Sequence, residues 1–129
     1  TAARILVVDD NQDAADSLAM MLQLDGHETR VVYTGKAAIA EAAKFAPHVV
    51  LLDIGLPEMD GYQVAGALRA DQALTKSRLI ALTGYGQPED RARALRAGFD
   101  DHLVKPISPE ELSATLERWM CDRHAGASR

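Results

Sequence analysis

Residues 4–10 read Arg-Ile-Leu-Val-Val-Asp-Asp, and residues 48–53 read His-Val-Val-Leu-Leu-Asp. Both stretches are short apolar runs that end on carboxylates, a pattern typical of strands buried on both faces of a parallel sheet. Ligands of open α/β sheets bind in the crevice at the carboxyl ends of the strands. Asp9, Asp10 and Asp53 are therefore predicted to lie together in one crevice.

Three carboxylates in one crevice repel one another, and this repulsion disfavours their joint ionisation. A hard divalent cation relieves the repulsion, and magnesium prefers one or two carboxylates together with phosphate oxygens. The two strand ends thus predict magnesium-assisted phosphate chemistry.

The composition is that of a soluble globular domain. The chain has 129 residues, of which 47% are hydrophobic and 26% charged, within the ordinary range for a single domain with its own core. The net charge is -5 and the chain has no run of Lys or Arg. Both features argue against nucleic acid or an anionic membrane as a direct partner.

Cysteine usage and the lack of targeting signals favour the cytoplasm. Cys121 is the single cysteine, so no internal disulfide can form and a reducing compartment is expected. No apolar stretch reaches the roughly 18 residues that a membrane span requires, and Thr1 leads into the first apolar run without a basic and apolar leader. We expect a soluble, unexported chain without membrane contact.

The whole chain alternates strand-like and helical patterns. Strands are predicted over residues 4–8, 28–33, 48–52, 78–82 and 99–104, and helices around residues 14–25, 36–45, 61–68, 88–97 and 108–119. In the second helix, Ile39, Ala43 and Ala46 recur at helical spacing and are predicted to face one way. The alternation predicts a parallel sheet with helices on both faces, joined by right-handed crossovers.

Four motifs at the ordered strand ends resemble those of response-regulator receiver domains of two-component signalling. They are Val7-Val8-Asp9-Asp10, Asp53-Ile-Gly-Leu-Pro57-Glu-Met-Asp60-Gly61, Leu82-Thr83-Gly84 and Val104-Lys105-Pro106. The resemblance covers nearly the whole chain. It implies a flavodoxin-like fold, with strand order 2-1-3-4-5, over residues 1–122, followed by a flexible tail over residues 123–129.

The resemblance also assigns the chemistry of the crevice. Asp53 would be the phosphoacceptor, a carboxylate nucleophile that takes a phosphoryl group from phosphohistidine. The domain would catalyse both its own phosphorylation and its own dephosphorylation. Asp10 would bind Mg²⁺ directly and Asp9 partly through water, with the Gly55 carbonyl completing the protein ligands and Mn²⁺ as an alternative ion. Asp10 or Asn11 could also cap the first helix.

Further residues at the strand ends would complete the site. The ammonium of Lys105 can reach a phosphoryl oxygen, and the resemblance implies a cis bond at Pro106. The Thr83 hydroxyl could donate to the phosphoryl group, while Gly84 keeps the neighbouring backbone uncrowded. Gly61 is predicted to be structural, a left-handed turn residue at the end of its loop.

His102 departs from the family, which usually carries Tyr or Phe at this switch position. Histidine is smaller and more polar, so the aromatic half of the switch formed with Thr83 is weakened, or replaced by a hydrogen bond that depends on protonation. When Asp53 is phosphorylated, the fourth helix, the fifth strand and the fifth helix are expected to shift. Gly55 and Tyr85 lie where the family tunes hydrolysis of the acyl phosphate.

Several functional interpretations are compatible with these motifs. A haloacid-dehalogenase-type phosphatase also uses a strand-end aspartate with magnesium, but it normally has a second aspartate where this chain has Gly55. A phosphorylation-silent interaction module of the same fold is a further alternative. Residues 81–90 look most like receivers of hybrid histidine kinases, whose partner would be a kinase core or a histidine phosphotransfer protein. A stand-alone response regulator is the other possibility.

Overall fold

A parallel sheet with helices on both faces forms the scaffold. The computed structural model describes residues 3–84 and 88–127, with side chains described at 3–84 and 92–119. Within these residues five parallel strands lie in the order β2-β1-β3-β4-β5, as predicted. The strands are β1 (Arg4–Val8), β2 (Glu28–Val32), β3 (Val49–Asp53), β4 (Arg78–Thr83) and β5 (Asp101–Val104).

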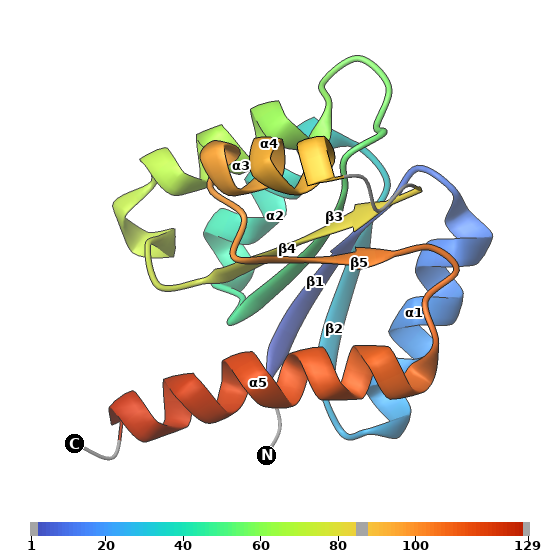
Figure 1. Cartoon of the computed structure of the whole chain (residues 1–129), viewed down its shortest axis with the longest axis vertical. Helices are drawn as coiled ribbons and strands as arrows, with labels where there is room; N and C mark the ends of the chain where they lie inside the picture. Colours follow the sequence, from blue (N-terminus) through green and yellow to red (C-terminus); the bar gives the residue numbers. More distant parts are fainter. Residues whose placement is uncertain (1–2, 85–87, 128–129) are drawn as a thin grey trace.

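The helices divide between the two faces of the sheet. They are α1 (Gln12–Leu24), α2 (Gly35–Phe45), α3 (Gly61–Ala70), α4 (Pro88–Ala97) and α5 (Pro109–Ala127), with a short 3₁₀ helix η1 (Gln72–Leu74) before β4. Helices α1 and α5 cover one face, and α2, α3 and α4 cover the other (Figure 1). This arrangement is the two-sided cover that the βα alternation predicts.

The strand β1 shows why its sequence is apolar throughout. Successive side chains of a strand point to opposite faces. Ile5 and Val7 pack into the core beneath α1 and α5, whereas Leu6 and Val8 pack into the core beneath α2 and α3. All four are fully buried, so a central strand of this sheet has no solvent face on which a polar residue could alternate.

The buried face of α2 differs from the predicted one. The structure buries Gly35, Ala38, Ala42 and Phe45, while Ala43 and Ala46, which were predicted to share a face with Ile39, are exposed. An alanine-rich helix offers several equivalent small-residue stripes. The large Phe45 side chain decides which stripe is buried, because its burial contributes most to stability.

The last helix is longer than predicted. It was expected to end about Trp119, but helical backbone continues to Ala127. The segment after Trp119 carries no Gly or Pro before Gly126, so it lacks the residues that usually end a helix. The flexibility of residues 123–129 stays a prediction. In the part of the chain that the structure describes, no helix has the length and apolarity needed to cross a membrane.

Histidine side chains bind the backbone at the amino end of β1. His27 Nδ1 accepts from the Ala3 N–H at 3.1 Å, and His48 Nδ1 accepts from the Arg4 N–H at 3.0 Å. Each imidazole must keep Nδ1 unprotonated to accept this bond. Burial lowers the pKa of His27 from its ordinary value of 6.5, an effect that the Asp25 carboxylate partly opposes.

Acidification is therefore expected to destabilise the fold through His27. The unfolded chain binds a proton at His27 more readily than the folded chain does, so stability falls as the pH drops from about 6.5 through the lowered folded pKa. Urea midpoints at pH 7.5 and 5.5 should fall further for the wild-type chain than for His27→Asn, whose amide oxygen can accept the same bond without titrating. Equal falls in both proteins would contradict this role.

Hydrogen bonds continue the sheet past the ends of its strands. Asp9 N donates to Val32 O at 3.2 Å, Ile54 N to Leu82 O at 3.2 Å, and Lys105 N to Thr83 O at 2.7 Å. These bonds hold the first residues of the following loops at the same edge of the sheet. The candidate site lies at this edge.

Candidate functional site

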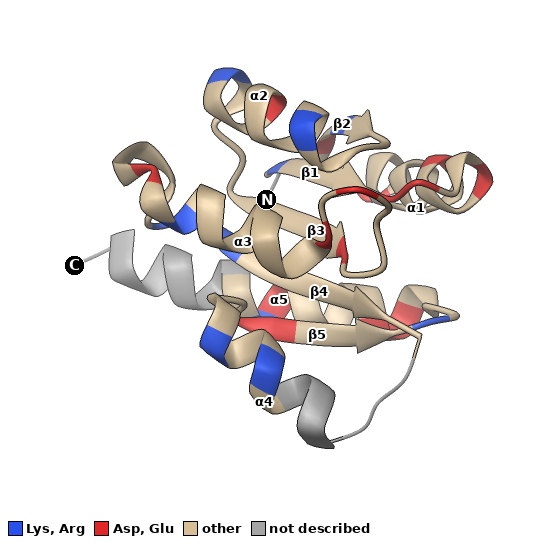
Figure 2. Ribbon diagram, turned by 90° about the horizontal axis from the view of Figure 1, so that it is seen from above, with Lys and Arg blue, Asp and Glu red and all other residues tan. Residues whose placement is uncertain are grey.

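Carboxylates gather at the carboxyl edge of the sheet. Among the described residues, Asp9, Asp10 and Asp53 each offer an oxygen, and these oxygens lie within 4.8 Å of one another. Figure 2 shows acidic residues in the loop that leads into α1 and beside the end of β3. Asp9 and Asp53 are buried, with 2% and 8% of their surfaces exposed, while Asp10 is exposed. The structure thus brings together the predicted trio.

Backbone N–H groups orient the two buried carboxylates. Asp9 Oδ1 accepts from Asn11 N at 3.0 Å, and Asp53 Oδ1 accepts from Gly55 N at 2.9 Å. The cap of α1 is Asn11 rather than Asp10, since Asn11 Oδ1 accepts from Ala14 N at 3.1 Å. The Asp10 carboxylate is therefore not the one that caps the helix.

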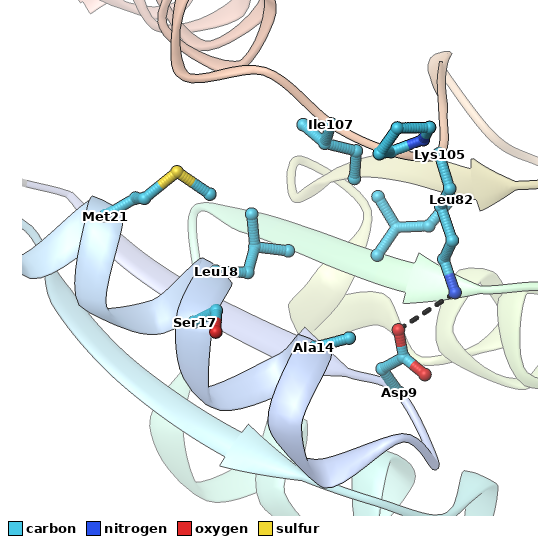
Figure 3. A pocket seen from close by; sticks show the side chains of 9 residues that line it. Asp9, Ala14, Ser17, Leu18, Met21, Leu82, Lys105 and Ile107 are labelled. Carbon is cyan, nitrogen blue, oxygen red and sulfur yellow. Dashed lines mark hydrogen bonds and ion pairs between the residues drawn. The ribbon is translucent and has the colours of Figure 1, made fainter.

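Lys105 supplies a positive charge inside the cluster. Its Nζ lies 3.0 Å from Asp9 Oδ2 and 3.2 Å from Asp53 Oδ2, and Figure 3 shows the contact with Asp9. The Lys105–Pro106 peptide bond is cis. Burial alone would lower the pKa of Lys105, but the hydrogen bond to Asp9 and the charge of Asp53 outweigh it and raise the pKa. The ammonium therefore stays charged at neutral pH.

Burial disfavours the negative charge of Asp53. Burial raises the pKa of Asp53, and Asp9 adds to this effect, while the Gly55 N–H and Lys105 oppose it without cancelling it. A raised pKa means that the ionised Asp53 is disfavoured in its surroundings. One ammonium beside three carboxylates, two of them buried, leaves an all-oxygen donor set that fits a hard divalent cation such as Mg²⁺.

Thr83 lies at the same edge of the sheet. In the parallel register Asp53 is opposite Leu82, so Thr83 is one residue beyond the partner of Asp53. Thr83 is 3% exposed, and it is opposite Val104, the residue before Lys105. A Cβ built on Gly84 would meet no described atom within 4 Å, and the role of Gly84 in keeping the backbone uncrowded stays a prediction.

His102 lies away from the carboxylates. It is opposite Ala81 in β4, and its Nδ1 is 3.8 Å from Asp101 Oδ1. It lines a pocket of about 390 Å³ with Glu111, Thr115 and Arg118 of α5. His102 therefore lies in the edge strand β5, beside a pocket shared with α5, and not in the site itself. Tyr85 is outside the described residues.

The prediction for Gly61 was right about a structural role but wrong about its cause. Among the described residues, Gly26 and Gly98 are the glycines with positive φ, and the left-handed residue of the β3–α3 loop is Glu58, at φ 66°. Gly61 is needed for space. A Cβ there would overlap Ile54 Cα and lie 2.7 Å from Asp53 O. Sequence alone does not reveal which backbone a glycine approaches.

Sequence reasoning also missed the cap of α3. The Asp60 side chain accepts from Gln63 N at 2.9 Å, and the Gln63 side chain accepts from Asp60 N at 3.0 Å. The signal was available, because an acidic residue followed three positions later by Gln is a capping-box pattern. This box fixes the end of the loop that begins at Asp53.

An apolar pocket that the sequence did not predict adjoins the site. It has a volume of about 430 Å³ and lies between α1 and the loop after β5, with Asp9 and Lys105 at one end (Figure 3). The remaining lining residues are Ala14, Ser17, Leu18, Met21, Leu82, Pro106 and Ile107. A partner that reaches Asp53 from this side would meet an apolar surface.

Comparison with known proteins agrees with this geometry. Residues 5–117 match the family model of the response regulator receiver domain. The chain is 38% identical over 115 residues to an uncharacterised 14.6 kDa protein of Leptolyngbya boryana, covering 89% of this chain and 88% of that protein. It is 38% identical over 113 residues to the DNA-binding response regulator MtrA of Mycobacterium tuberculosis, covering 88% of this chain but 48% of MtrA.

A solved structure is similar in fold and in sequence. The receiver domain of the sensor histidine kinase PA1611 from Pseudomonas aeruginosa, with a magnesium ion coordinated in its active-site cleft, superposes with a TM-score of 0.84 at 33% identity. The match covers 92% of this chain and 98% of that domain. The chain therefore spans nearly all of one receiver domain and about half of a DNA-binding regulator.

Proposed function

Because the chain belongs to the response-regulator receiver family, we propose that Asp53 accepts a phosphoryl group from a phosphohistidine in a magnesium-dependent reaction. One observation carries the proposal. The oxygens of Asp9, Asp10 and Asp53 lie within 4.8 Å of one another, and Lys105 Nζ contacts two of these carboxylates. Phosphoryl transfer needs this combination of a positioned nucleophile and concentrated positive charge.

The proposed transfer uses residues already oriented in the structure. An Asp53 carboxylate oxygen attacks the phosphorus, the bond from phosphorus to the histidine nitrogen breaks, and that nitrogen keeps the electron pair and takes up a proton. The product is an acyl phosphate on Asp53. Lys105 would offset charge on the phosphoryl oxygens, and the Thr83 hydroxyl would donate to one of them. Hydrolysis of the acyl phosphate at the same site would reset the domain.

The metal ligands would be Asp9, Asp10, Asp53 and the Gly55 carbonyl. When bound, Mg²⁺ supplies positive charge that neutralises the oxygens of the transferred group, and Mn²⁺ would substitute for it. Asp9 and Asp53 are buried carboxylates that share the ammonium of Lys105, and this excess of negative charge favours such an ion. The magnesium in the similar PA1611 receiver is in keeping with this assignment.

Phosphorylation would act on the face formed by α4, β5 and α5. The added phosphoryl group brings negative charge and new acceptor oxygens, and Thr83 is positioned to respond from the end of β4. We propose that Thr83 and His102 take part in a shift between two populations that phosphorylation biases. Amide chemical shifts in these elements should change when a phosphate mimic is added.

The proposed partner is a histidine kinase core or a histidine phosphotransfer protein. The apolar pocket beside Lys105 favours a protein donor that packs against α1. We further propose that the domain belongs to a hybrid histidine kinase and works in the cytoplasm without contacting nucleic acid or membrane itself. The similar PA1611 receiver, which is named as part of a sensor histidine kinase, supports this proposal. The alternative is a response regulator that is separate from its kinase, and the similar DNA-binding response regulator MtrA is an example of that class.

Intact mass spectrometry tests the proposed phosphorylation. The chain is incubated with a small-molecule phosphodonor and with a phosphorylated phosphotransfer protein, each with and without Mg²⁺. We expect a magnesium-dependent gain of one phosphoryl group that Asp53→Asn lacks. No gain from either donor would instead favour a phosphorylation-silent module, and a gain that persists in Asp53→Asn would place the acceptor elsewhere.

A further inference from the structure

Gly35 occupies a crowded position between α2 and the loop that follows Asp53. It is the first residue of α2, directly after Thr34, whose side chain caps the helix through Ala37 N. A Cβ built on Gly35 would lie 2.8 Å from Val64 Cγ2, 3.1 Å from Met59 O and 3.2 Å from Met59 Cβ. Any larger residue must therefore displace a neighbour.

Neither neighbour can yield easily. Val64 is fully buried in α3, and a β-branched side chain in a helix has essentially one χ1 rotamer. Helix α3 lies beside α2 on the same face of the sheet (Figure 1), and its first turn is fixed by the Asp60 capping box. The nearer contact atom on Met59 is a backbone oxygen and the other, Cβ, moves only with the backbone, so removing this contact requires the β3–α3 loop itself to move.

This loop is short and closed, so a displacement at Met59 reaches Gly55. Met59 N donates to Pro57 O at 2.7 Å, and Gly61 N donates to Ile54 O at 3.2 Å across the base of the loop. Gly55, near the start of the loop, donates its N–H to Asp53 Oδ1. The two sides of the loop are thus tied to each other and to the Asp53 carboxylate.

We propose that Gly35 is a positioning residue for the magnesium site, because its missing side chain sets the place of the β3–α3 loop. The inference rests on the proposed function, in which the Gly55 carbonyl is a metal ligand. Mg²⁺ demands near-octahedral geometry with oxygens at about 2.0–2.1 Å. A loop shifted by a few tenths of an ångström would weaken binding even though Gly35 is not itself a ligand.

Calorimetric titration of the whole chain with MgCl₂ tests this role. Gly35→Ala is expected to weaken Mg²⁺ binding by about tenfold, the lower end of the loss seen when residues behind metal ligands are replaced. Without Mg²⁺, the amide resonances of Gly55 and Met59 should also shift. Gly66→Ala is the matched control, because a Cβ there meets nothing within 4 Å and its Mg²⁺ affinity should equal that of the wild type.

A double variant tests whether crowding at Gly35 causes the loss of Mg²⁺ affinity. Gly35→Ala with Val64→Ala removes the nearest clashing atom and leaves the Met59 contact, so its affinity should lie between those of the wild type and Gly35→Ala. If the single variant does not fold, the double variant carries the test. Wild-type affinity in the folded Gly35→Ala, or in the double variant where only that folds, would overturn the proposal. Failure of the wild-type chain to bind Mg²⁺ would instead overturn the proposed function.

Discussion

Replacement of Lys105 by methionine is expected to slow phosphoryl incorporation at Asp53 by roughly a hundredfold or more, the usual effect of removing one group that stabilises transition-state charge. In the same variant Mg²⁺ binding should become tighter. These opposite changes follow from the position of Lys105 Nζ, 3.0 Å from Asp9 Oδ2 and 3.2 Å from Asp53 Oδ2. A variant that was merely less well folded would lose both properties together.

The tighter metal binding has an electrostatic cause. With Lys105 present, its ammonium already satisfies part of the charge on Asp9 and Asp53, so an incoming cation gains less. Methionine has a similar length and no charge, so the carboxylates then depend on the metal alone. At a few ångströms, unit charges near a protein surface interact by about 4 kcal/mol before screening by salt, which is ample for a measurable gain in affinity.

Lys76→Met is the matched control for Lys105→Met. Lys76 is exposed before β4, at the opposite edge of the sheet from the carboxylates, so the same chemical change should leave both phosphorylation rate and Mg²⁺ affinity unaltered. Rates come from the time course of intact mass with a small-molecule donor, and affinities from calorimetric titration. Weaker Mg²⁺ binding in Lys105→Met would show that Lys105 supports the metal site instead of competing with the metal.

The sequence was sufficient for those features that depend on local pattern. The apolar runs before Asp9 and Asp53 predicted central strands, and strand polarity then placed both aspartates at one edge, as the structure shows. The sequence was insufficient for features that are determined by which elements pack against each other. The rotation of α2 depends on where Phe45 fits, and the apolar pocket beside Lys105 depends on how α1 lies against the loop after β5.

The role of Gly61 also depends on its packing partners, and its replacement is expected to have a large effect on stability. Gly61→Ala should lower the free energy of unfolding by about 3 kcal/mol, the upper end for an overpacked site. Both obstructing groups, Ile54 Cα and Asp53 O, are backbone atoms, so neither can rotate away. Because Asp53 itself would be displaced, phosphoryl incorporation should fall as well. Urea denaturation monitored by circular dichroism measures the stability.

Gly61→Asn distinguishes crowding from the left-handed turn that the sequence had predicted. Asn is the side chain that best tolerates a left-handed backbone, so a conformational requirement would make it less destabilising than Ala. Crowding makes it at least as destabilising, since it adds the same Cβ and further atoms. Gly66→Ala, in the same helix and in open space, should instead gain up to about 1 kcal/mol from helix propensity. If Gly61→Asn proved clearly more stable than Gly61→Ala, the steric explanation would be wrong.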